Sequence, residues 1–106
     1  MANSYKNAKV DLTSADATTV LTTSAGSTNV IKSILVAEDS GNADTIDLTI
    51  VAGSDTFNLF KVKAVGANTT VELLTQPLVL QDSEILKAEA ATANRLHIVV
   101  SYLEIS

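Results

Sequence analysis

The sequence predicts an all-β domain in which two antiparallel sheets, with about eight short strands in total, pack as a β-sandwich or a jelly roll. Two observations support this fold class. Short segments rich in Val, Ile, Leu and Thr recur along the 106 residues, and the four glycines separate them at intervals of twelve to fifteen residues within small polar clusters. Turns at this spacing favour short antiparallel strands over a helical or α/β domain.

The expected strands lie between these turns. Their residues are 18–23, 29–37, 45–51, 56–65, 70–75, 78–80, 85–90 and 95–105, with a further edge segment at residues 9–13. The clearest strand is the third, in which Ile46, Leu48 and Ile50 alternate with polar residues. Because side chains alternate between the two faces of a strand, we expect these three residues to face the core.

The strand at residues 56–65 contains a change of phase. Its apolar residues switch faces between Leu59 and Phe60, and one extra residue in the strand would produce that switch, so we predict a β-bulge there. Residues 88–93 have a helical composition, but Asn94 and the strong strand that follows favour a strand and a loop over a turn of helix.

The polar turn at residues 66–69 is expected to close a hairpin. A four-residue loop there would pair Val62 with Leu73 on the inner face of the sheet and Lys63 with Glu72 on the outer face. The ion pair between Lys63 and Glu72 would then help to set the register of the two strands.

The final strand is apolar on both faces. One face carries the alternating residues Leu96, Ile98, Val100 and Tyr102. The other face carries Val99, Leu103 and Ile105. We therefore expect the end of this strand to be buried on both sides, or its second face to be covered by a neighbouring chain.

The length of the chain is that of a single domain. We expect residues 9–106 to form one β-sandwich, and residues 1–8, which are mostly polar, to form a flexible N-terminal arm that becomes ordered on a neighbour. The sequence shows no secretory signal and no apolar stretch long enough to cross a bilayer, so we expect synthesis in the cytoplasm and no membrane contact.

The composition argues against several classes of function. The absence of cysteine excludes disulfides, thiolate zinc sites and cysteine nucleophiles, and no cofactor site is expected. The net charge of −5 repels phosphate backbones, so we do not expect nucleic-acid binding. Aromatic residues make up only 4% of the chain, which disfavours a sugar site built on stacked rings.

Few residues are candidates for catalysis or metal binding. His97 is the only histidine and no Gly-x-Ser-x-Gly motif is present, so neither a metal pair of histidines nor a serine nucleophile is expected. Residues 38–44 gather three carboxylates, but their spacing departs from that of a calcium loop and favours a polar turn. Asp82 and Glu84 are likewise interpreted as turn residues, and we expect no enzyme activity.

Three segments carry a resemblance to a known family. The segments at residues 17–23, 30–36 and 96–105 resemble small virion structural proteins of tailed bacteriophages, especially marine and cyanobacterial phages. The resemblance implies a non-enzymatic capsid decoration or cement protein that binds the outer surface of the phage head. Its alternatives are a protein of the tail, neck or fibre, and a β-sandwich module that binds a receptor or a glycan.

This resemblance implies where the protein acts and what it contacts. The protein would be made in the host cytoplasm and reside in the virion, with the major capsid protein, other virion proteins or further copies of itself as partners. The residues expected to make assembly contacts come from both ends of the chain and are Tyr5, Lys6, Lys9, Tyr102, Leu103 and Ile105.

Overall fold

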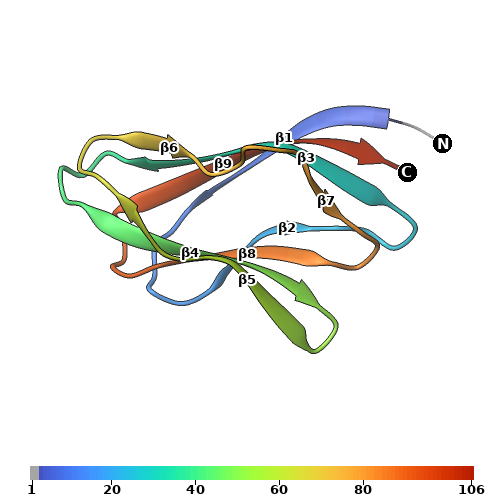
Figure 1. The fold of residues 1–106 in the computed structure, drawn as a ribbon, viewed down its shortest axis with the longest axis horizontal. Helices are drawn as coiled ribbons and strands as arrows, with labels where there is room; N and C mark the ends of the chain where they lie inside the picture. Colours follow the sequence, from blue (N-terminus) through green and yellow to red (C-terminus); the bar gives the residue numbers. More distant parts are fainter. Residues whose placement is uncertain (1–2) are drawn as a thin grey trace.

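The computed structural model describes residues 3–106, which form nine β-strands and no helix (Figure 1). The strands are β1 (Asn3–Asp11), β2 (Thr18–Thr22), β3 (Thr28–Glu38), β4 (Asp44–Ala52), β5 (Asp55–Val65), β6 (Thr70–Glu72), β7 (Leu78–Leu80), β8 (Ile85–Ala90) and β9 (Leu96–Ile105). This described part of the chain accordingly contains no helix that could span a membrane. The predicted all-β class is confirmed.

Two antiparallel sheets face each other across the core (Figure 1). Sheet A has the strand order β1-β9-β3-β6, with β7 also paired to β3, and sheet B has the order β2-β8-β4-β5. Because β6 and β7 pair with separate stretches of β3, they act as one interrupted strand. The pairs are nested, since β1 pairs with β9, β2 with β8, β3 with β6 and β7, and β4 with β5. Such nesting in two facing sheets is the jelly-roll arrangement.

The core between the sheets consists mainly of aliphatic side chains. Its fully buried members include Ile31, Ile34, Val36, Ile46, Leu48, Leu86, Ile98 and Val100. The inward positions predicted for Ile46 and Leu48 are confirmed, and Ile50 is half-buried against the same cluster. Burying each large aliphatic side chain contributes about 1.5 to 3 kcal/mol to the free energy of unfolding.

The bulge predicted in β5 is confirmed, and a second bulge lies next to it. The pairing of β5 with β4 shifts on both sides of the Leu48↔Phe60 pair, so β5 has an extra residue before and after Phe60. Val62 lies in the second bulge with φ 53°, and its N–H donates to Oδ1 of Asp47 at 2.6 Å. This bond satisfies a backbone group that the bulge displaces from the ladder.

The hairpin predicted between β5 and β6 is wrong. β5 belongs to sheet B and β6 to sheet A, so residues 66–69 connect the two sheets and Glu72 does not pair with Lys63. The carboxylate of Glu72 instead accepts hydrogen bonds from Oγ of Ser33 and from the N–H of Ile34. Burial raises the pKa of Glu72, but these hydrogen bonds outweigh it and hold the pKa below its usual value.

β1 is longer than the edge segment expected at residues 9–13. It begins at Asn3 and pairs with β9 over its whole length, so residues 3–8, assigned from the sequence to an arm, lie in a strand. Residues 1–2 of that arm lie outside the described residues. Because Asn3 pairs with Ile105, both ends of the described chain lie together at one end of the sandwich (Figure 1). At residues 88–93 the strand and loop are confirmed, since β8 ends at Ala90.

Candidate assembly surface

The outer face of sheet A carries a row of apolar side chains that crosses four strands. Tyr5 of β1 pairs with Leu103 of β9, Leu103 pairs with Val30 of β3, and Val30 pairs with Val79 of β7. Residues paired directly across antiparallel strands project from the same face of a sheet. The inward face of β9 is fixed by its buried residues Leu96, Ile98, Val100 and Tyr102, so this row faces outward.

The two ends of this apolar row are its most exposed members. Tyr5 is 79% exposed and Val79 is 49% exposed, while Leu103 and Val30 between them are half-buried. A second, shorter row lies beyond the polar row of Asn7, Ser101 and Ser33, where Val99 of β9 pairs with Leu35 of β3, a leucine that is 38% exposed. We call these six apolar residues, which flank the polar row on both sides, the sheet A patch.

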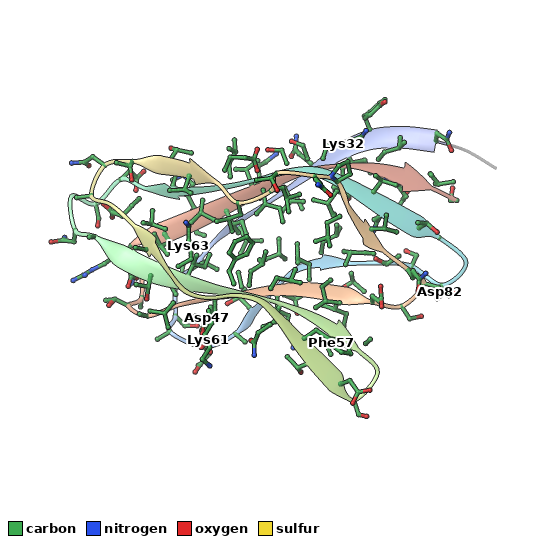
Figure 2. All side chains as sticks on the ribbon, viewed as in Figure 1. Lys32, Asp47, Phe57, Lys61, Lys63 and Asp82 are labelled. Carbon is green, nitrogen blue, oxygen red and sulfur yellow. The ribbon has the colours of Figure 1, made fainter. Side chains whose placement is uncertain are left out.

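The outer face of sheet B has a different character. Thr49 of β4 pairs with Lys87 of β8, and Asp47 pairs with Glu89, so polar and charged side chains cover the middle of this face. Figure 2 shows Asp47 and Lys61 on this lower side of the molecule. The outer face of sheet B is therefore readily hydrated. Burying the sheet A patch against another protein would instead be favourable in free energy.

The structure separates the residues predicted to make assembly contacts. Tyr5 and Leu103 belong to the sheet A patch, and Lys9 and Ile105 project from the same face beside it. Tyr102 is only 8% exposed and packs in the core. Lys6 shares the inward phase of Tyr102 but is exposed near the end of the sandwich, where its Nζ forms an ion pair with Oε1 of Glu104 at 2.9 Å. The hydrogen bond to Glu104 raises the pKa of Lys6.

Several exposed apolar residues were not identified from the sequence. Val30, Leu35 and Val79 lie in strands that are apolar at both phases, and the sequence does not show which phase faces outward. A further exposed apolar residue, Phe57, lies on the projecting β4–β5 hairpin and is 56% exposed (Figures 1 and 2). The sequence signal for Phe57 is its position as the third residue of the strand that follows the polar turn at Gly53.

The acidic loop after β3 is organised by its own carboxylate. Glu38 is 1% exposed, and its Oε1 and Oε2 accept hydrogen bonds from Oγ of Ser40 and from the N–H groups of Ser40, Gly41, Asn42 and Asn68 at 2.8 to 3.1 Å. The bond from the Ser40 hydroxyl, with the backbone donors, lowers the pKa of Glu38 to about 2 despite the opposing effect of burial. The carboxylate is thus engaged with the protein's own donors.

The carboxylates of the turn before β8 are engaged in the same way. Oδ2 of Asp82 accepts a hydrogen bond from the N–H of Gly26 at 2.8 Å, and Oε1 of Glu84 accepts one from the N–H of Gln81 at 2.7 Å. Among residues 3–106, no group of three or more His, Asp or Glu side chains is placed to hold a metal ion. These acidic residues therefore fasten loops to the sandwich.

His97 lies on the outer face of sheet A, where it pairs with Asp11 of β1 and with Ala37 of β3. A shallow depression beside it is lined in part by Asp39 and Arg95. Within the described chain, no hydrogen bond or ion pair joins His97 to either aspartate. The side chains around His97 are thus not held in the fixed hydrogen-bonded order that a nucleophile, its base and its orienting acid require.

Comparisons with known proteins find similarity among solved structures. No family model matches the chain, and no curated protein matches its sequence. Among solved structures, the chain is similar to a pentameric capsid protein isolated from metagenomic phage sequences, with 18% sequence identity and a TM-score of 0.46. The match covers 94% of this chain but 59% of that one, so the chain spans about three fifths of the length of the capsid protein. A similarity at this level leaves the function to be argued from the residues.

Proposed function

We propose that this chain is a non-enzymatic structural protein of a phage particle, a capsid decoration protein that binds the outer surface of the head. The observation that carries the proposal is the sheet A patch, with Tyr5, Leu103, Val30 and Val79 aligned across four strands. Contiguous exposed apolar surface on a small protein commonly marks a contact with another molecule. The patch also contains two of the residues expected from the sequence to make assembly contacts.

The arrangement of the two faces suits a protein that covers a larger body. The outer face of sheet A carries apolar rows between polar ones, whereas polar and charged side chains cover the middle of the outer face of sheet B, so the chain can lie on a protein surface through sheet A and present sheet B to water. Each square ångström of apolar surface removed from water contributes about 25 cal/mol to binding, but association also costs translational and rotational entropy. A protein that binds a particle through several linked contacts offsets this entropic cost by avidity.

The fold and the family resemblance support the same class of protein. Jelly rolls occur in viral capsid domains, in lectins and in cupins, so the fold alone does not choose among them. The metal site of a cupin has no counterpart among residues 3–106. A lectin site built on stacked rings would need aromatic residues, and the exposed aromatic residues Tyr5 and Phe57 lie in different sheets. The resemblance of residues 17–23, 30–36 and 96–105 to phage virion proteins supports the remaining choice.

The copy number of the chain in purified virions tests this proposal. Quantitative mass spectrometry with the major capsid protein as internal standard is expected to give a copy number comparable to that of the capsid subunit. A few copies per particle would instead place the chain at the neck, tail or fibre. Absence from the particle would contradict a virion role, and a glycan array would then test the receptor-binding alternative.

A further inference from the structure

β1 presents a long unpaired edge. Its nine residues pair with β9 in one continuous register, from Asn3↔Ile105 to Asp11↔His97, without a bulge. Within the described chain, β1 has β9 as its only partner and forms the end of sheet A. A strand at the end of a sheet leaves every second N–H and C=O group available to another strand.

The other edges of the two sheets are interrupted. β5 has two register shifts and carries Lys61 and Lys63, both exposed. β6 and β7 form three-residue strands with Pro77 between them, and β2 has five residues and a register shift. Bulges, lysines, prolines and short strands are the devices by which proteins prevent a sheet edge from pairing. β1 also carries two exposed lysines, Lys6 and Lys9, but it is the long edge from which bulges and proline are absent.

The backbone of β1 also fixes which residues face the open edge. The N–H of Leu12 donates to the carbonyl oxygen of Leu96 at 3.0 Å, in the same register as the adjoining Asp11↔His97 pair. In an antiparallel ladder, hydrogen-bonded and non-hydrogen-bonded pairs alternate. The even-numbered residues of β1 therefore bond to β9, and the odd-numbered residues point their N–H and C=O groups to the open edge. These outward residues are Asn3, Tyr5, Asn7, Lys9 and Asp11.

We propose that the occupant of this edge is β1 of a second copy of the chain, paired antiparallel about a two-fold axis at Asn7. In this register Asn7 lies opposite Asn7 of the second copy, Tyr5 opposite Lys9, and Asn3 opposite Asp11. Each of these pairs joins two outward-facing residues, as a hydrogen-bonded pair requires. All nine residues of β1 take part, so the register uses the whole edge.

The side chains of this register complement one another. Lys9 of one copy lies across from the exposed ring of Tyr5 of the other, where its stem packs on the ring and its ammonium group is attracted to the ring face. The same contact occurs twice because the axis is two-fold. No pair in this register joins two like charges.

Neighbouring registers are less favourable. If the pairing shifts by two residues, so that the two-fold axis moves from Asn7 to Lys6, then Lys6 lies directly opposite Lys6 of the second copy. Like charges at that position are destabilising. A shift of two residues the other way removes residues 3 and 4 of each copy from the pairing. The side-chain chemistry of β1 thus selects the register centred on Asn7.

The dimer would double the sheet A patch. Two copies joined through β1 form one continuous sheet, and the outer faces of both copies lie on the same side of it. The row that begins at Tyr5 then meets Lys9 of the second copy and, beyond it, the Val99 and Leu35 of that copy. This inference rests on the edge of β1 and holds whether or not the chain belongs to a virion.

Engineered cysteines test the register directly, because the natural chain contains no cysteine. The Cα atoms of a hydrogen-bonded antiparallel pair lie about 5.5 Å apart, within reach of a disulfide. Mild oxidation is therefore expected to cross-link the Asn7→Cys protein into a dimer. The Tyr5→Cys protein is expected to stay uncross-linked alone, since its two cysteines would lie about 13 Å apart along the strands, and to cross-link when mixed with the Lys9→Cys protein.

A backbone substitution tests the pairing itself. Asn7→Pro removes an N–H that faces the open edge and leaves the hydrogen bonds to β9 in place, so the fold is expected to persist while the mass in solution falls to that of a monomer. Asn7→Ala is the matched control, because it removes the side chain and keeps the N–H, and it is expected to remain a dimer. A concentration-independent monomeric mass of the natural chain, a dimer that survives Asn7→Pro, or equal cross-linking of Tyr5→Cys and Asn7→Cys alone would each overturn the proposal.

Discussion

A single buried carboxylate organises the loop between β3 and β4. The donors that surround Glu38 come from residues 40–42 and from Asn68 in the connection between the two sheets, so one side chain joins two loops at the same end of the sandwich. A buried charge is tolerated there because donors satisfy both of its oxygens. Gly41, with φ 85°, allows the tight path that brings these N–H groups together.

The pH dependence of stability is expected to reflect Glu38. Its pKa is lowered from 4.5 in the unfolded chain to about 2 in the folded protein. The folded state therefore gains stability from this group at pH values above 4.5, and the gain is lost as the pH falls from 4.5 toward 2. Urea unfolding across this range should show a smaller fall in unfolding free energy for Glu38→Gln than for the natural chain. Equal falls in both proteins would show that Glu38 does not provide this linkage.

Adjacent residues of β9 should respond very differently to truncation. Ile98 is fully buried between the sheets, so Ile98→Ala is expected to lower the free energy of unfolding by about 2 to 5 kcal/mol. Val99 projects from the outer face of sheet A, and Val99→Ala is expected to cost about 1 kcal/mol or less. Denaturant titrations of the two variants provide the comparison, and similar losses would contradict the assigned faces of β9.

At the level of elements, the double bulge of β5 places a β-branched residue in an unfavourable conformation. Val62 has φ 53° and is 63% exposed, so it bears the cost of a left-handed backbone without the benefit of burial. Val62→Gly is expected to raise the free energy of unfolding by about 1 kcal/mol. Val79→Gly is the control, an exposed strand valine outside the positive-φ residues, and should lower it. A loss of stability in Val62→Gly similar to that in Val79→Gly would contradict this account of the bulge.

The strands could be predicted from the sequence because each depends on local features. Alternation identifies the core face of β4, and the change of phase at Phe60 reveals a bulge in β5. The partner of each strand is a long-range property, and local features do not encode it. The loop at residues 66–69 looks the same whether it closes a hairpin or carries the chain from sheet B to sheet A, which is why the predicted pairing of β5 with β6 was wrong.

The assembly surface could be predicted only in part for the same reason. Leu103 was identified because β9 is apolar at both phases, and the core requires only one of them. Val30 and Val79 can be identified as part of a surface only when the strand pairing is known, because the pairing places them in one row with Leu103. Tyr102 and Lys6 share the inward phase, so their predicted role in surface contacts has to be tested separately from that of Tyr5.

On the scale of the whole molecule, the jelly roll divides the surface by chemistry. Sheet A offers the apolar rows of the sheet A patch and an open edge at β1, while sheet B offers a face with a polar centre and an interrupted edge at β5. The face would bind the particle and the backbone of the edge would bind a second copy, with Tyr5 at the border between the two contacts. A dimer could then attach to the particle through two patches, which strengthens binding by avidity.

The most direct test of the virion role is a binding measurement on particles that lack this chain. Leu35→Lys places a charge in the sheet A patch, and Thr49→Lys places the same charge on the outer face of sheet B as the matched control. Both residues lie on outer faces, so both variants are expected to fold. In co-sedimentation with the particles, Leu35→Lys should weaken binding at least about tenfold, equivalent to about 1.4 kcal/mol, while Thr49→Lys binds like the natural chain. Equal binding by Leu35→Lys and the natural chain, or a loss confined to Thr49→Lys, would contradict the account.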